Sequence, residues 1–100
     1  MIKHIVMWRL KDFADGRSKK ENLERMKTWL MSLKDKIKEV KRLEASTDML
    51  YTDPAFDIVF YSEFEDEKAL ETYKNHPEHR KLVDFVSKIK ETRELVDYRI

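Results

Sequence analysis

Two segments of this chain are apolar on both of the faces that a β-strand presents. Successive side chains of a strand point to opposite sides of the sheet, so a strand with one wet face alternates apolar and polar residues. Segment 2–10 instead carries Val6 and Trp8 on one face and Ile5 and Met7 on the other. Segment 56–64 repeats the pattern, with Phe56, Ile58, Phe60 and Phe64 opposite Val59 and Tyr61. We predict two strands that are covered on both sides.

Two helices are predicted around the second of these strands. Ser18, with Glu21 three residues later, forms a capping box whose side-chain oxygens satisfy amides at a helix start. Asp66 is placed to cap the second helix, and Pro77 interrupts that helix because proline has no amide hydrogen. The first helix has an apolar stripe at alternating spacings of three and four, formed by Leu23, Met26, Leu30, Leu33 and Ile37.

The element order predicts the fold class. Segment 40–45 is a weaker strand candidate whose polar content suggests a sheet edge, and segment 95–100 is typical of a closing strand. The order is β-α-β-β-α-β, which indicates a ferredoxin-like α+β sandwich with a four-stranded antiparallel sheet. A chain of 100 residues fits a single domain over residues 1–100.

One face of such a sheet is left without helices. Ile5, Met7, Val59 and Tyr61 share one parity and make that face apolar. Each such side chain left in water forgoes about 1.5–3 kcal/mol, a large loss for a domain of marginal stability. The chain has no cysteine, so no disulfide compensates for its small core. We therefore expect a homodimer whose two copies pack sheet to sheet through this face.

Charge and hydropathy argue against several classes of partner. Lys and Arg number 21 against 20 Asp and Glu, and this balance favours neither nucleic acid nor an anionic membrane as a partner. The longest apolar run, residues 5–8, is far shorter than the roughly 20 residues that span a bilayer. No secretory signal is visible, so a cytoplasmic location is the default expectation. The histidine spacing and the single glycine predict no metal site and no phosphate-binding loop, and we expect no cofactor.

Segment 73–79, Tyr-Lys-Asn-His-Pro-Glu-His, is the stretch richest in chemistry. Because Pro77 breaks the helix, Tyr73 and His79 can point at a common spot from either side of a kink. Imidazole suits proton transfer near neutral pH, which makes His79 a candidate catalytic residue beside Tyr73. His4 lies on the apolar face of the first strand and joins them. The candidate ligand-binding residues around them are Val6, Trp8, Phe60 and Phe85.

Each of these residues also has a structural interpretation. A histidine beside a proline commonly caps a helix or fills a turn, which applies to both His76 and His79. A buried His4 with one hydrogen-bond partner needs no catalytic role. Apolar and aromatic side chains at these spacings form plain core more often than a pocket.

Several segments together resemble a known family. They are Lys3 to Lys11 (KHIVMWRLK), Asp57 to Phe64 (DIVFYSEF), the His-Pro-x-His string within 73–79, and Val96-Asp97-Tyr98. This combination resembles the stress-responsive A/B barrel domain proteins, also called dimeric α+β barrel proteins. The resemblance implies a ferredoxin-like protomer whose sheet meets a twin sheet to close a dimeric α+β barrel.

The resemblance also implies roles for three residues. An enzymatic member of the family, a plant polyketide cyclase, uses a histidine as general base and a tyrosine that holds the substrate in a pocket between sheet and helices. Through the His-Pro-x-His string, the base falls on His79 and the tyrosine on Tyr73, with His4 matched in the first strand.

Three function classes remain open. The leading expectation is a protein that binds a small hydrophobic molecule, with aldol-type cyclisation or isomerisation as its enzymatic form. In that form His79 is the base and Tyr73 positions a carbonyl group. A non-catalytic dimeric stress or structural protein is the second class. The third is a cofactor-independent monooxygenase, which no residue here singles out.

Overall fold

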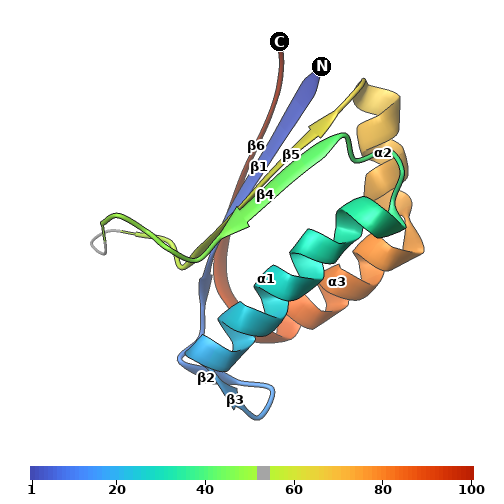
Figure 1. The fold of residues 1–100 in the computed structure, drawn as a ribbon. Helices are drawn as coiled ribbons and strands as arrows, with labels where there is room; N and C mark the ends of the chain where they lie inside the picture. Colours follow the sequence, from blue (N-terminus) through green and yellow to red (C-terminus); the bar gives the residue numbers. More distant parts are fainter. Residues whose placement is uncertain (52–54) are drawn as a thin grey trace.

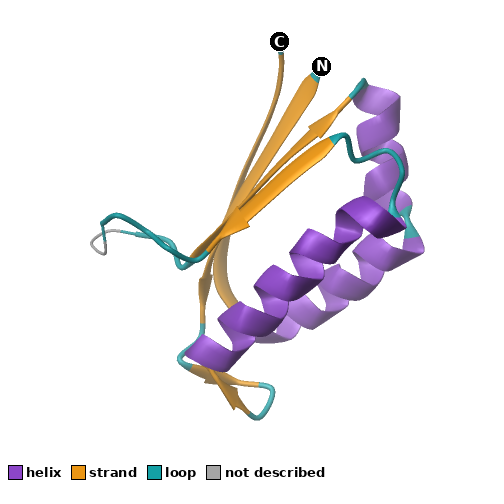
Figure 2. Ribbon diagram, in the orientation of Figure 1, coloured by secondary structure: helices purple, strands orange, loops and turns teal. Residues whose placement is uncertain are grey.

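A computed structural model describes residues 1–51 and 55–100 of the chain. In this part, helices cover one face of a four-stranded antiparallel sheet and leave the other face open (Figures 1 and 2). The predicted ferredoxin-like α+β fold is confirmed. The elements are β1 (Ile2–Leu10), β2 (Phe13–Ala14), β3 (Arg17–Ser18), α1 (Lys19–Lys36), β4 (Arg42–Ser46), β5 (Ile58–Phe64), α2 (Glu67–Asn75), α3 (Pro77–Ile89) and β6 (Lys90–Arg99).

Strand β1 is central in the sheet, whose order is β4-β5-β1-β6. It pairs antiparallel with both neighbours, so that Ile5 lies opposite Tyr61 of β5 and Val96 of β6. Cross-strand partners share a face of the sheet. The even-numbered residues of β1 are buried and face the helices, whereas the odd-numbered residues are half-buried and face away.

Helix α1 begins at the predicted capping box. The Ser18 hydroxyl accepts a hydrogen bond from the Glu21 amide, and the Glu21 carboxylate accepts one from the Ser18 amide, both at 3.2 Å. The predicted stripe then packs on the sheet, with Met26, Leu30 and Leu33 at most 1% exposed. The core lies between the helices, α2 and α3 included, and the even-numbered side chains of β1 and β5.

The predicted break at Pro77 separates α2 from α3. His76 caps the new helix, because its Nδ1 atom accepts a 3.1 Å hydrogen bond from the Glu78 amide. Pro77 occupies the first position of α3, where a missing amide hydrogen leaves no helical bond unmade. None of the helices in the described ranges is long and apolar enough to cross a membrane.

Strand β6 begins five residues earlier than the sequence pattern predicts. The prediction started at residue 95, whereas pairing with β1 extends back to Lys90 opposite Leu10. Residues 90–94 are almost all charged, because β6 is an edge strand whose residues remain largely accessible to water. Residues 90–94 therefore show no alternation of apolar and polar side chains, although their backbone is extended. Strands β4 and β5 each begin two residues later than predicted.

A small hairpin, β2–β3, lies in the segment between β1 and α1. Asp15 and Gly16 form its turn with φ values of 53° and 74°. Positive φ at both central residues is the geometry of a type I′ turn, for which Asp-Gly is a preferred pair. The hairpin places Ala14 so that its carbonyl accepts a 3.0 Å hydrogen bond from the buried Asn22 side chain of α1.

Candidate functional site

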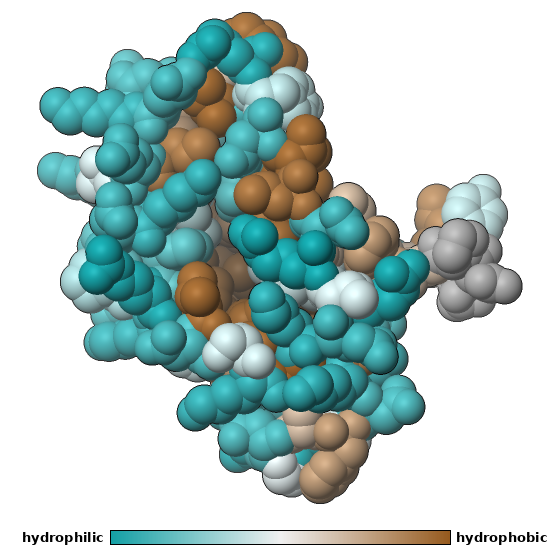
Figure 3. Space-filling model, turned by 180° about the vertical axis from the view of Figure 1, so that it is seen from behind, coloured by the Kyte–Doolittle hydropathy of each residue, from teal (hydrophilic) through white to brown (hydrophobic). Residues whose placement is uncertain are grey.

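A pocket of about 420 Å³ lies between the sheet and the helices. Strands β1, β5 and β6 form one wall, and α2 and α3 form most of the other. Its side of the molecule shows apolar surface among hydrophilic side chains (Figure 3). Six of the predicted site residues line it: His4, Val6, Trp8, Phe60, Tyr73 and His79.

Phe85, the seventh predicted residue, does not line this pocket. Its ring stacks on Trp29 of α1 with centroids 5.2 Å apart, and the Arg25 guanidinium lies 4.8 Å from its centroid. Residues 82, 83, 86 and 87 of α3 line the pocket instead. Phe85 lies on the side of α3 that packs against α1, where it forms a contact between helices.

Tyr73 and His79 meet across the break between α2 and α3. Their ring centroids are 4.4 Å apart. The Nδ1 atom of His79 donates a 3.0 Å hydrogen bond to the Lys74 carbonyl, because a carbonyl oxygen can only accept. This bond selects the tautomer in which Nε2 carries the lone pair. Burial lowers the pKa of His79, and the positive charges of Arg93 and Lys74 lower it further, against the effect of the carbonyl.

His4 is held by a carboxylate on the neighbouring strand. The register of β1 and β6 places His4 directly opposite Asp97, and the His4 Nδ1 hydrogen-bonds to the carboxylate. Lys74 binds the other carboxylate oxygen at 3.3 Å. Burial lowers the pKa of His4 although Asp97 opposes the shift. Burial opposes the shift of Asp97, but its bonds to His4 and Lys74 hold its pKa below the usual value.

The site therefore combines neutral bases with a hydrogen-bond donor. Both imidazoles present Nδ1 to a fixed partner, which leaves Nε2 as the atom able to accept a proton. Burial raises the pKa of Tyr73 well above its usual range, so its hydroxyl remains protonated and can donate. The centroids of His4 and Tyr73 are 6.0 Å apart, which places all three rings in one cluster.

Four charged residues of the site were missed by sequence reasoning. Asp97, Lys90 and Arg93 come from β6, and Lys74 comes from the end of α2. Asp97 was part of the family resemblance, but no local pattern shows that β6 pairs with β1 at His4. Within residues 1–51 and 55–100, no group of three or more His, Asp or Glu side chains is arranged to hold a metal ion.

The sequence profile of the family described as "Stress responsive A/B Barrel Domain" matches residues 2–100. The chain belongs to this family. No curated protein matches this A/B barrel protein in sequence. Solved structures do match it over nearly its whole length.

One similar structure is a dimeric protein of unknown function with a ferredoxin-like fold from Bacteroides fragilis. It is 28% identical, with 99% of this chain and 95% of that chain covered and a TM-score of 0.82. A ferredoxin-like protein of the same family from Mesorhizobium loti is 26% identical, with coverage of 99% and 95% and a TM-score of 0.69. The hydroxynitrile lyase of Passiflora edulis is 19% identical, with coverage of 99% and 92% and a TM-score of 0.80, and shares the fold.

Proposed function

We propose that this A/B barrel protein binds a small, largely apolar molecule in the pocket between sheet and helices. The observation that carries the proposal is the composition of the pocket wall. Apolar side chains from both layers of the fold, the sheet and the helices, surround one cluster of polar rings, as in a site that holds an apolar body and orients it by a few polar groups. A volume of about 420 Å³ is within the range of small-molecule sites.

The test is binding of a neutral aromatic compound, naphthamide, measured by isothermal titration calorimetry. Val83 lines the pocket but is 48% exposed, so Val83→Trp narrows the entrance without overpacking the core. Met31 on α1 is 46% exposed and lies outside the pocket, so Met31→Trp is the matched control. We expect binding by the wild type and the control, and its loss in Val83→Trp. Equal binding by both variants contradicts the proposal, as does a wild type that binds neither naphthamide nor its carboxylate counterpart, naphthoate.

Proton transfer on a bound carbonyl compound is the second candidate function, favoured by the His4–Asp97 contact. A carboxylate on Nδ1 orients the ring and stabilises the imidazolium that forms when Nε2 takes a proton. In the proposed step an imidazole removes a proton from the carbon beside the carbonyl group. The electron pair of the broken C–H bond forms the C=C bond of an enolate as the C=O π pair moves to the carbonyl oxygen, and the Tyr73 hydroxyl donates a hydrogen bond to that oxygen. Return of the proton to carbon completes an isomerisation or exchange.

The fold accommodates catalysis in at least one similarly folded protein, since the Passiflora structure is a hydroxynitrile lyase. His79 is the base that the family resemblance implies, and His4 has the better-oriented ring. For this chain, the assay is deuterium uptake by the methyl group of acetophenone in heavy water, followed by NMR spectroscopy. Loss of uptake in His79→Gln assigns the base to His79, and loss only in His4→Gln assigns it to His4.

His76 is the matched control for these variants, because it caps α3 outside the pocket. We expect His76→Gln to retain uptake. Tyr73→Phe keeps the ring but removes the hydroxyl, and we expect uptake to fall by about a hundredfold, as for the loss of an oxyanion donor. Uptake by the wild type no faster than in buffer contradicts the catalytic candidate and leaves a binding protein.

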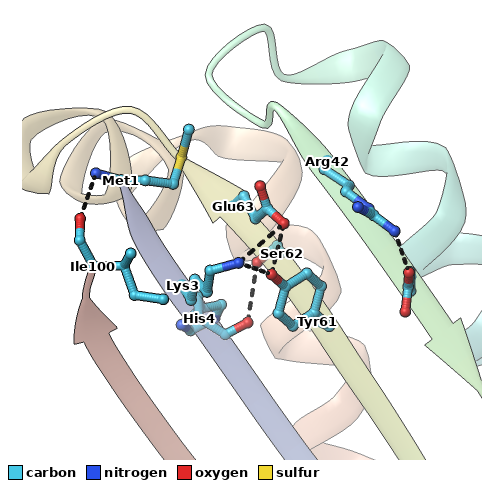
Figure 4. Close-up of polar contacts among 9 residues, drawn as sticks. Met1, Lys3, His4, Arg42, Tyr61, Ser62, Glu63 and Ile100 are labelled. Atoms are coloured by element: carbon cyan, nitrogen blue, oxygen red, sulfur yellow. Dashed lines mark hydrogen bonds and ion pairs between the residues drawn. The ribbon is translucent and has the colours of Figure 1, made fainter.

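We further propose that the protein is a homodimer joined through the open face of the sheet. Ile5, Met7, Val59 and Tyr61 are only half-buried there, and Val96 and Tyr98 of β6 extend the same apolar face at 46% and 40% exposure. Lys3 donates to the Tyr61 hydroxyl at 2.7 Å and Tyr61 donates to Glu63 at 2.6 Å, which satisfies the polar groups at one end of the face (Figure 4).

Similar structures from Bacteroides fragilis and Thermobifida fusca are described as dimeric, which supports this assembly. Sedimentation over a concentration series tests it directly. We expect a species of twice the chain mass at micromolar concentration and above. A monomer that persists well above that range contradicts the proposal.

A further inference from the structure

The entrance of the pocket carries an excess of positive charge. Lys74, Lys90 and Arg93 all line it. Lys74 is matched by Asp97, whose carboxylate lies 3.3 Å from the lysine Nζ and also bonds to His4. Lys90 and Arg93 take part in no ion pair with any described residue within 4 Å. Two cations at the mouth therefore lack a partner in the described part of the protein.

The position of Arg93 directs this charge into the site. Arg93 lies opposite Trp8 in the β1–β6 register, so its side chain starts from the helix-facing side of the sheet. Its charge reaches both imidazoles, because it lowers the pKa of His4 and of His79. The lowered pKa values of both histidines favour their neutral form, so the two rings neither add to this positive charge nor balance it. The charge of Arg93 therefore makes the electrostatic potential inside the pocket positive.

The inner wall is apolar in contrast. It is formed by Val6, Trp8, Leu30, Phe60, Leu82 and Val86, each at most 6% exposed. A ligand that matches both the apolar inner wall and the positively charged entrance has an apolar body with an anionic group at one end. A neutral ligand leaves Arg93 and Lys90 without a partner, and a cationic ligand is repelled.

We propose that the ligand of this pocket is a small apolar carboxylate, whose carboxylate group is bound at the entrance by Arg93 with help from Lys90. This inference deepens the proposed binding function and rests on it. The guanidinium fork matches a carboxylate with two parallel hydrogen bonds, whereas the lysine ammonium adds a single point charge. The protonated Tyr73 hydroxyl remains available to a further oxygen of the ligand.

The experiment compares naphthoate with naphthamide, which have the same ring system and differ in charge. Calorimetry on the wild-type protein is expected to show naphthoate binding about tenfold tighter or more, as for a charge-assisted hydrogen-bonded pair at a partly wet site. Arg93→Gln is expected to remove most of this preference while the naphthamide affinity changes by less than about twofold. Lys90→Gln is expected to reduce the preference by a smaller factor.

Arg99→Gln is the matched control, because Arg99 lies on the same strand and pairs with Glu67 outside the pocket. We expect this variant to retain the full preference for naphthoate. Arg93 is exposed, so its substitution leaves the core intact and circular dichroism should be unchanged.

The outcomes separate this inference from the proposed function. Equal affinity of the wild type for both compounds overturns the carboxylate specificity but leaves the pocket as a binding site. A preference for naphthoate that survives Arg93→Gln overturns the role of Arg93. Failure of both compounds to bind overturns the binding function and the specificity together.

Discussion

The two faces of the sheet are built from the same strands but are completed differently. Residues of β1 that face the helices are at most 6% exposed, from Ile2 to Leu10. On the other face, Ile5 and Met7 are half-buried and Val96 is 46% exposed. The helix-facing side is thus buried by the chain itself, and the open side presents the apolar surface that the proposed dimer would bury.

The two faces of the sheet also differ in the side chains that change charge with pH. The rings of the buried His4 and the half-buried His79, whose pKa values are both lowered, lie on the helix-facing side. The open side carries Lys3 and Glu63, whose hydrogen bonds raise the pKa of the lysine and lower that of the glutamate. Moderate acid should therefore act on the inside of the protomer before it changes the charges of the open face.

The largest expected effect on stability comes from removing a buried side chain on the helix-facing side of the sheet. Phe60 is 1% exposed and lines both core and pocket. Phe60→Ala should lower the free energy of unfolding by about 3–5 kcal/mol, because it removes a buried ring and leaves a cavity. Urea unfolding followed by circular dichroism measures the change. Phe13→Ala is the control, since Phe13 is 69% exposed, and a similar loss in both variants would contradict the contrast.

A charge introduced on the open side of the sheet should dissociate the dimer and leave the protomer folded. Met7→Lys places an ammonium group at the centre of the proposed interface and should raise the dimer dissociation constant by about a hundredfold or more. Sedimentation velocity measures the shift. Met31→Lys adds the same charge on the exposed side of α1 and should leave the dimer intact. A Met7→Lys protein that remains fully dimeric would place the interface elsewhere.

Acid should destabilise the protomer through His4 and His79. The folded-state pKa values of His4 and His79 lie below the ordinary value of 6.5, so the unfolded chain binds more protons in that window. Stability is therefore complete above pH 6.5 and is lost as the pH falls from there toward the lowered values. Urea midpoints across this range measure the loss, and His79→Gln should make it smaller. A midpoint that rises on acidification contradicts the assignment.

The smallest expected effect comes from a change at the start of helix α1, in a residue that belongs to neither face of the sheet. Ser18→Ala removes the cap of α1 and should lower the free energy of unfolding by about 1 kcal/mol. Its dimer dissociation constant should not change. Among residues 1–51 and 55–100, the Ser87 hydroxyl of α3 hydrogen-bonds only to the Asp84 carbonyl one turn earlier, so Ser87→Ala should have a smaller effect on thermal unfolding. A change in dimerisation by Ser18→Ala would show that the two faces are coupled.

Much of the fold could be predicted because its signals are local. The capping box at Ser18, the cap at Asp66 and the break at Pro77 each depend on residues a few positions apart, and each is confirmed. The start of β6 could not be predicted from periodicity, because an exposed edge strand does not need apolar alternation. The contact of Phe85 with Trp29 could not be predicted, because helical spacing predicts a stripe but not which neighbour that stripe contacts.

In the candidate site too, contacts between residues close in sequence could be predicted, whereas contacts between distant strands could not. Tyr73 and His79 are six positions apart across a proline, so the sequence alone could predict that they meet. Asp97 is 93 positions from His4, and their contact follows from the pairing of β1 with β6. Arg93 reaches the pocket through the same register.

By itself, the sequence determined the caps, the helix break, the alternation of the central strands and the presence of an apolar face opposite the helices. These features are set by backbone hydrogen bonding and by side-chain periodicity over a few residues. Only the tertiary structure decided which strands are neighbours, and hence that His4 is held by Asp97 and that Arg93 lies at the pocket mouth. Local patterns specify elements, whereas contacts distant in sequence arise when those elements pack to bury their apolar faces together.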